Sequence, residues 1–192
     1  MISKIPYINQ TKGVYNKETK QYEHTDWPFK KLGNNIVYTY GCLLSSSQMA
    51  LSYYENSLVT IDDGERSMYA TGGGADKWSM LRSVQNMGYK YSFVDSKQEV
   101  DNALNAGKPV IAHIKGVLNG VDYSNPQHFV LIIGKLNKDE YAISDPFSEA
   151  NSYVISQKVF KWNEINNIAI SKDYSGGGYP DMKYIIISKN VF

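Results

Sequence analysis

A single cysteine, Cys42, stands at the start of the clearest helical pattern in the chain. Apolar and small residues recur at helical spacing from there to about Glu55, and Gly41 before it permits a sharp turn. A thiol in the first turn of a helix lies near the positive end of the helix dipole, which favours the nucleophilic thiolate. Cys42 is therefore a candidate nucleophile. The alternative is a buried structural cysteine that begins a core helix.

A cysteine nucleophile needs a base that takes its proton and a third group that orients this base. Three histidines are available. His24 lies in a polar N-terminal region, and His113 lies inside a strand pattern, where a structural role is favoured. His128 stands where a polar loop enters the most apolar run of the chain, a position at which a sheet presents side chains at a cleft. It is the candidate base.

Asp145 precedes a proline at the end of the next predicted strand. In an antiparallel hairpin, the start of one strand lies beside the end of the following strand. His128 and Asp145 are therefore expected to be neighbours. Each also has a structural explanation, as a strand-end histidine and as a turn residue before proline. Taken together with the lone cysteine, they favour a triad of Cys42, His128 and Asp145.

The elements that must position these residues change character along the chain. Helical patterns cover 42–55, 76–87 and 96–106. Strand patterns cover 5–10, 89–94, 110–114, 128–134, 140–144, 153–160 and 184–188, the last of which is expected to close the sheet. The stretches 11–35 and 116–127 are predicted to be polar loops, and 162–166 a short helical turn. Because helices come first and strands later, the sequence predicts an α+β fold.

Composition limits the possible roles. The chain has 192 residues, 42% of them hydrophobic and 20% charged, which predicts one globular domain over 1–192. A net charge of +1 argues against nucleic acid or an anionic membrane as the main partner. One cysteine excludes an internal disulfide and a multi-cysteine metal site, and we expect no cofactor. The sequence predicts no membrane span and no signal peptide, which leaves a cytoplasmic protein, a virion component or a domain of an exported protein.

Five motifs occur in a characteristic order: Gln10, Gly41-Cys42, 107–111, 127–130 and 141–146. In this order, over about residues 5 to 150, the chain resembles the papain-fold peptidases related to the bacteriocin-processing enzymes, family thirty-nine of the cysteine peptidases. The resemblance implies a papain-like fold. An N-terminal helical part would carry the cysteine, an antiparallel sheet would carry the histidine and the aspartate, and the active cleft would lie between them.

The resemblance also implies a role for each residue. Cys42 would be the nucleophile, His128 the general base and then the general acid, and Asp145 the group that holds the imidazole. Gln10 would donate its side-chain amide to the oxyanion, beside the backbone amide of Cys42. Leu43 and Leu44 replace the small residues that many relatives have after the cysteine, so we expect their bulk to narrow the cleft or shield the thiol.

We therefore expect a cysteine peptidase or amidase that works through a thioester acyl-enzyme. The expected substrate is a peptide with small residues near the cut, either a glycine-containing leader or a cell-wall (peptidoglycan) peptide, as in a phage-tail or secreted module. No transporter domain follows, which argues against leader processing tied to export. The alternative is an inactive papain-like module that uses a tyrosine-rich cleft for binding, an idea that the bulk of Leu43 and Leu44 supports. An acyl transferase with the same triad is a third possibility.

Overall fold

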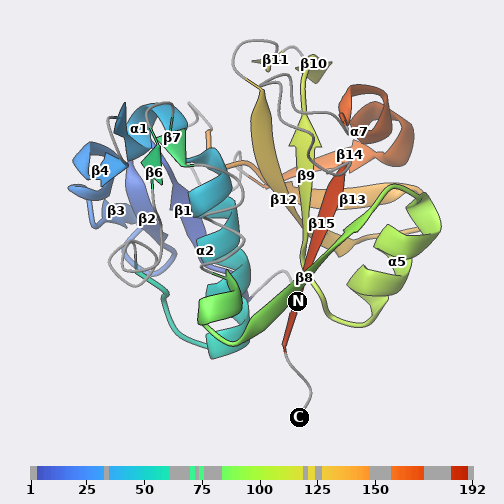
Figure 1. Cartoon of the computed structure of the whole chain (residues 1–192), viewed down its shortest axis with the longest axis horizontal. Helices are drawn as coiled ribbons and strands as arrows, with labels where there is room; N and C mark the ends of the chain where they lie inside the picture. The colour runs from blue at the N-terminus through green and yellow to red at the C-terminus, as the bar shows by residue number, and fades with distance from the viewer. Residues whose placement is uncertain are drawn as a thin grey trace.

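A six-stranded antiparallel sheet is the largest element of the fold. This computed structural model describes residues 4–32, 35–60, 70–71, 74–75, 84–118, 121–123, 127–147, 157–170 and 183–189. The strand order is β14-β13-β12-β9-β15-β8 (Figure 1). The strands are β8 (Tyr89–Val94), β9 (Val110–Ile114), β12 (His128–Lys135), β13 (Glu140–Ser144), β14 (Gln157–Lys161) and β15 (Tyr184–Lys189).

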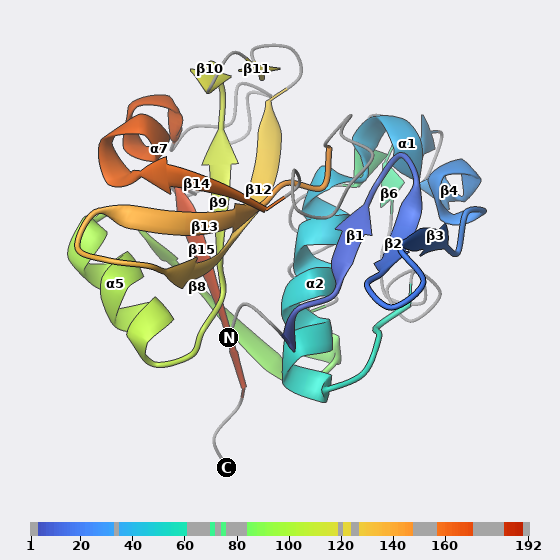
Figure 2. The ribbon, with the colours of Figure 1, turned by 180° about the vertical axis from the view of Figure 1, so that it is seen from behind.

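Helices cover both faces of this sheet (Figures 1 and 2). Helix α2 (Cys42–Glu55) packs on one face, mainly against β12. Helices α5 (Lys97–Asn105) and α7 (Trp162–Ile168) pack on the other. Successive residues of β12 therefore join different cores: Leu131 faces the α2 side, whereas Ile132 faces the side of α5 and α7. A strand buried on both faces explains the continuous apolar run of 128–134.

A smaller N-terminal part lies on the far side of α2 from the sheet (Figure 2). It contains a three-stranded antiparallel sheet, β1-β2-β3. Its elements are β1 (Tyr7–Asn9), β2 (Gly13–Asn16), β3 (Gln21–Glu23), the 3-10 helix η2 (Trp27–Phe29), β4 (Lys31–Leu32), β5 (Asn35–Ile36) and α1 (Val37–Tyr40). Two further short pairs are β6 (Ala70–Thr71) with β7 (Gly74–Ala75), and β10 (Val117–Leu118) with β11 (Val121–Asp122).

The main helices and strands confirm the sequence-based prediction, including the capped helix at 96–106. The Ser96 hydroxyl accepts from the Glu99 amide, and the Glu99 carboxylate accepts from the Ser96 amide. Gly107 follows the helix at φ +73°, the left-handed conformation in which glycine often ends helices. The mixed helices and antiparallel sheet agree with the predicted α+β class. No helix in the described part of the chain is long and apolar enough to cross a membrane.

Three predictions of structure were wrong. The stretch 11–35 is not an irregular loop, because it folds into β2, β3, η2 and β4. The stretch 116–127 contains the β10–β11 hairpin. The last strand does not close the sheet at an edge, since β15 pairs with β9 on one side and β8 on the other. Most of the predicted helix at 76–87, and residues 153–156 of a predicted strand, lie outside the described residues.

Candidate active site

The joint between α1 and α2 fixes the position of Cys42. Cys42 is the first residue of α2, directly after Gly41, and its side chain is partly buried. Gly41 has φ −85°, a conformation open to any residue, so it is not required for an unusual turn. A Cβ at Gly41 would lie 2.5 Å from the Val37 carbonyl oxygen and 2.6 Å from its Cγ1. Glycine is therefore needed here because the chain passes close to Val37, the first residue of α1.

The two leucines after the cysteine face the core. Leu43 and Leu44 are 4% and 3% exposed and belong to the apolar cluster between α2 and the sheet. The prediction that they narrow the cleft or shield the thiol is therefore wrong. At the start of a helix, consecutive residues point in different directions, and both leucines are directed toward apolar partners while Cys42 lines a pocket.

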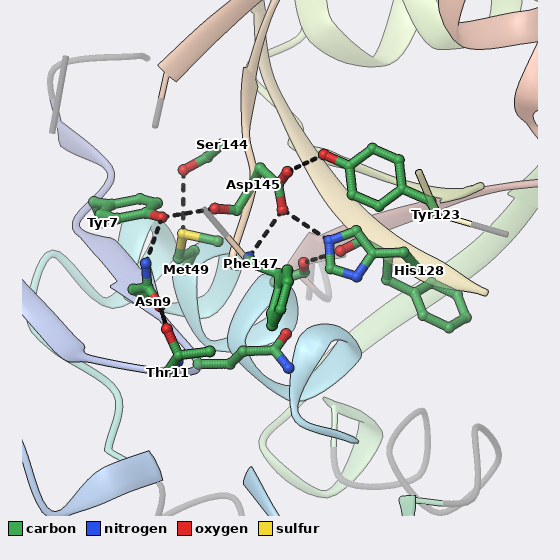
Figure 3. Close-up of polar contacts among 12 residues, drawn as sticks. Tyr7, Asn9, Thr11, Met49, Tyr123, His128, Ser144, Asp145 and Phe147 are labelled. Carbon is green, nitrogen blue, oxygen red and sulfur yellow. Dashed lines mark hydrogen bonds and ion pairs between the residues drawn. The ribbon is translucent and has the colours of Figure 1, made fainter. Parts of the chain in front are cut away.

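His128 and Asp145 are hydrogen-bonded neighbours, as the hairpin geometry predicts. His128 is the first residue of β12, and Asp145 directly follows β13. The Nε2 atom of His128 lies 2.7 Å from Oδ1 of Asp145 (Figure 3). Both side chains are buried. Because Nε2 is engaged by the carboxylate, Nδ1 is the ring nitrogen left for the thiol of Cys42, which is a hydrogen-bond partner of His128.

The Asp145 carboxylate has donors on both oxygens (Figure 3). Oδ1 also accepts from the backbone N–H of Phe147 at 2.9 Å. Oδ2 accepts from the hydroxyl of Tyr123. Tyr123 is buried, and its ring stacks on the His128 imidazole with 4.9 Å between centroids. A buried carboxylate held by three donors is stabilised in its charged form and fixed in orientation.

Strand β1 supports the turn that carries Asp145. The hydroxyl of Tyr7 donates to the Asp145 carbonyl oxygen at 2.7 Å, and Asn9 donates to the Tyr7 hydroxyl at 3.2 Å (Figure 3). The backbone N–H of Gln10, directly after β1, donates to the Pro146 carbonyl oxygen at 2.8 Å. The same segment thus braces the turn after β13 and places the side chain of Gln10.

The buried side chain of Gln10 is held at the pocket wall. Its Nε2 donates to the Tyr38 carbonyl oxygen at 2.9 Å. An amide nitrogen carries two hydrogens, so one bond to Tyr38 leaves a second hydrogen to donate. Gln10, Cys42 and His128 line one pocket with a volume of about 260 Å³, and Asp145 lies behind His128. The structure thus brings the four predicted residues together.

Burial and charge act in opposite directions on the three ionisable groups. Burial opposes ionisation of Cys42, but hydrogen bonding to His128, its charge and two backbone amides hold the pKa of the thiol below its usual value. Burial alone would lower the pKa of His128, whereas Asp145 and Cys42 raise it to about 10. Burial opposes ionisation of Asp145, yet the charge of His128 and donated hydrogen bonds lower its pKa. The opposite shifts of the Cys42 and His128 pKa values therefore favour a thiolate–imidazolium pair over two neutral groups.

Two aromatic residues of the site were not predicted from the sequence. Tyr123 lies within a stretch that was interpreted as a polar loop, and no local pattern sets it apart from the other tyrosines. Phe147 follows the Asp-Pro pair, and its ring meets the edge of His128 at 6.2 Å between centroids. The one sequence signal for Phe147 was its position directly after the motif 141–146, which contains Asp145.

Comparisons with known proteins agree with this arrangement. Residues 2–170 match the family model described as Peptidase_C39 like family. The chain is similar to a C39-like protein from Bacillus anthracis, with 14% identity, a TM-score of 0.57 and coverage of 98% of this chain and 96% of that chain. It is also similar to the peptidase domain of Streptococcus ComA, a bi-functional ABC transporter of a quorum sensing pathway. That match has 10% identity, a TM-score of 0.53 and coverage of 79% and 93%. No curated protein sequence matches the chain.

Proposed function

We propose a catalytic site for this chain, which belongs to the Peptidase_C39 like family and is a cysteine-type peptidase with a papain-like α+β fold. The proposed catalytic residues are Cys42, His128, Asp145 and Gln10. The observation that carries this proposal is the continuous series of contacts from carboxylate to imidazole to thiol at the wall of one pocket. The opposite pKa shifts of Cys42 and His128 support it, because the nucleophile of a cysteine peptidase is a thiolate.

In the proposed acylation step, the Cys42 thiolate attacks the scissile carbonyl carbon and forms a carbon–sulfur bond. The carbonyl electron pair moves to oxygen, and this oxyanion accepts hydrogen bonds from Gln10 Nε2 and from the backbone N–H of Cys42. The carbon–nitrogen bond then breaks. Protonated His128 gives its Nδ1 proton to the departing amine, which leaves a thioester and a neutral imidazole.

In the proposed deacylation step, neutral His128 takes a proton from water, and the oxygen of that water attacks the thioester carbon. Collapse of the second tetrahedral species breaks the carbon–sulfur bond and releases the carboxylic acid. The thiolate and the imidazolium are regenerated together. Asp145 stays ionised throughout, because it accepts hydrogen bonds from three donors and faces the imidazolium charge.

For the substrate, we propose a peptide with small residues, such as glycine, next to the scissile bond. The aromatic wall of the pocket supports this assignment. Tyr38 and Phe147 line the pocket and restrict the space beside Cys42. A glycine-containing leader peptide and a short cell-wall peptide both fit this class.

Thiol labelling tests the catalytic site independently of the substrate. We expect iodoacetamide to alkylate Cys42 well below pH 8.5, and His128→Ala to slow this reaction, because the imidazole is the main partner that stabilises the thiolate. A Cys42 that reacts with the pH dependence of an ordinary thiol, unchanged by His128→Ala, would refute the proposed site.

Hydrolysis assays test the reaction and the substrate class. Fluorogenic peptides with Gly-Gly at the cut, matched peptides with Leu-Leu there, and purified peptidoglycan are incubated with the wild type and with Cys42→Ala. We expect cleavage of the glycine peptides in preference to the leucine peptides, and no cleavage by Cys42→Ala. Wild-type cleavage of peptidoglycan alone would assign the cell-wall substrate, and equal cleavage of both peptide sets would contradict the size argument.

The rival interpretation, an inactive binding module, arose from the bulk of Leu43 and Leu44. Both side chains are accounted for by packing in the core, so this feature of the described residues no longer supports it. The labelling experiment separates the two interpretations, since a binding module needs no activated thiol.

A further inference from the structure

Tyr123 contacts two members of the proposed triad at once (Figure 3). Its ring is parallel to the His128 imidazole, at an interplanar angle of 0° and a centroid distance of 4.9 Å. Its hydroxyl donates to Oδ2 of Asp145, the carboxylate oxygen that does not bind His128. Tyr123 is 5% exposed, so both contacts are shielded from water.

The proposed mechanism requires His128 and Asp145 to keep a fixed orientation. One hydrogen bond between Nε2 and Oδ1 does not by itself stop the imidazole from turning about its Cβ–Cγ bond. Such a turn would move Nδ1 away from Cys42. The carboxylate can also rotate about its own carbon–carbon bond, which would carry Oδ1 away from the ring. A second contact on each group is needed to stop these rotations.

Tyr123 contacts both groups, and on Asp145 it acts together with the backbone N–H of Phe147. The stacked ring blocks tilting of the imidazole, since a tilted ring would collide with the tyrosine face. The hydroxyl holds Oδ2, while the backbone N–H of Phe147 holds Oδ1. With both rotations blocked, Nδ1 remains directed at the thiol of Cys42.

The position of Tyr123 is itself set from outside the pocket. Tyr123 follows β11, and its backbone N–H donates to the Gly116 carbonyl oxygen at 2.7 Å. Gly116 adopts φ +144°, and a Cβ there would lie 2.9 Å from Cγ2 of Ile168 in α7. Contacts of the β10–β11 hairpin and α7 thus determine where the tyrosine ring lies.

We propose that Tyr123 is a positioning residue of the catalytic site, which holds His128 and Asp145 in the orientation that directs Nδ1 to Cys42. It acts through these two side chains and not on the scissile bond. This inference rests on the proposed function. It adds to that function a residue that no motif identified, and it predicts a loss of turnover without a loss of substrate binding.

The test compares Tyr123→Phe and Tyr123→Leu with a matched control, Tyr141→Phe. Tyr141 is also buried, also donates its hydroxyl to a buried aspartate, Asp101, and also contacts an aromatic ring. It lies in β13 among the residues of the opposite core. The control therefore removes the same group from a similar environment away from the pocket.

For Tyr123→Phe, we expect kcat to fall roughly 10-fold with KM within about 2-fold of the wild type, because misorientation affects the reacting state and not the bound substrate. For Tyr123→Leu, which also lacks the stacked ring, we expect a fall of roughly 100-fold. The apparent pKa of Cys42, measured by the pH dependence of alkylation, should rise in Tyr123→Leu. Tyr141→Phe should lower Tm and leave kcat and this pKa unchanged.

Three results would overturn the inference: unchanged kcat in Tyr123→Phe, an increase in KM alone, or equal losses of kcat in Tyr123→Phe and Tyr141→Phe. Circular dichroism and Tm establish that each variant is folded, and Tyr123→Phe decides the matter if Tyr123→Leu does not fold. Cys42→Ala is assayed in parallel, and it distinguishes a failure of the inference about Tyr123 from a failure of the proposed function. Hydrolysis by Cys42→Ala would refute the catalytic site itself, whereas an inactive Cys42→Ala beside a fully active Tyr123→Phe would refute only the role of Tyr123.

Discussion

Cys42 and His128 shift each other's ionisation in the directions that a cysteine nucleophile needs. The thiol loses its proton more readily because the imidazole binds it, and the imidazole keeps its proton because a carboxylate and a thiolate face it. Burial opposes both charges. The two charges are therefore interdependent, and removal of one partner returns the other toward its neutral form.

This interdependence predicts the pH dependence of kcat/KM. The active form has a deprotonated Cys42 and a protonated His128. Because the pKa of the thiol is lowered, activity should rise with pH through a value below the ordinary thiol pKa of about 8.5. Because the pKa of His128 is raised to about 10, activity should fall only as pH approaches that value. A profile with a single rising limb near pH 8.5 would contradict the ion pair.

The position of Gln10 predicts a separation of two activities. Gln10→Ala should lower kcat by about 100- to 1,000-fold, the usual effect of removing one oxyanion donor. Alkylation of Cys42 by iodoacetamide forms no oxyanion, so its rate should stay within about 3-fold of the wild type. Peptide hydrolysis and alkylation are measured on the same preparation. Equal losses in both would indicate that Gln10 supports the fold and not the oxyanion.

At the scale of elements, each proposed catalytic residue lies at the end of a helix or strand. Cys42 begins α2, His128 begins β12, Asp145 follows β13 and Gln10 follows β1. Element ends combine a backbone fixed by regular hydrogen bonds with side chains that can face open space. Four such ends meet around one pocket, which gives the site a rigid frame.

A charged cluster around Asp101 joins α5 to β12 and β13 on the opposite face of the sheet. Asp101 in α5 accepts from Lys97 of the same helix at 2.8 Å and from Lys135 in β12 at 2.7 Å. It also accepts from the hydroxyl of Tyr141 in β13. Burial would raise the pKa of Asp101, but these donors hold it below its ordinary value. Asp101 therefore couples α5 to β12, which begins with His128, and to β13, which Asp145 follows.

We expect Asp101→Asn to lower the free energy of unfolding by about 1–3 kcal/mol at pH 7, because it leaves two lysines without their shared carboxylate. The folded-state pKa of Asp101 lies below the unfolded value, so its stabilisation is present above that value and is lost as pH falls through the folded pKa. The difference between variant and wild type should therefore shrink as the pH falls below the unfolded pKa. Urea titrations from pH 7 to pH 3 measure it, with the exposed Asp95→Asn as control. A constant difference across this range would argue against the cluster.

At the scale of the whole molecule, the six-stranded sheet separates two apolar cores that support different elements. The core on the α2 side supports the helix that begins with Cys42, and the core of α5 and α7 supports the opposite face. Of two adjacent residues in β12, one lies in the first core and the next lies in the second. Substitutions at these two positions can therefore test the two cores separately.

Leu131→Ala and Ile132→Ala form this pair. Both side chains are fully buried, so each substitution should lower the free energy of unfolding by about 2–5 kcal/mol. Only Leu131→Ala opens a cavity beneath α2, so only it should slow the alkylation of Cys42 at a temperature where both variants are folded. Chemical denaturation and alkylation rates measure the two effects. Equal slowing by Ile132→Ala would show that the two cores do not act separately.

Sequence reasoning succeeded where local patterns decide the structure. The apolar run at 128–134 and the turn before Glu140 were enough to place His128 beside Asp145, because a hairpin is a local contact. Sequence reasoning failed for β2 and β3, because these strands are short and largely polar. It also failed for the position of β15 in the sheet, because that position depends on pairing with strands far away in the chain. Tyr123 escaped notice for the same reason, since its importance comes from partners that only the folded structure brings near.

The distance along the chain between Tyr7 and Asp145 has a consequence for biosynthesis. These hydrogen-bonded residues are 138 positions apart. At about 5–20 residues per second, a ribosome delivers the second roughly 7–28 s after the first. During that interval β1 can pair with β2, but the carboxylate that orients His128 does not yet exist. The proposed catalytic residues can therefore act in series only after this late segment of the chain has been synthesised.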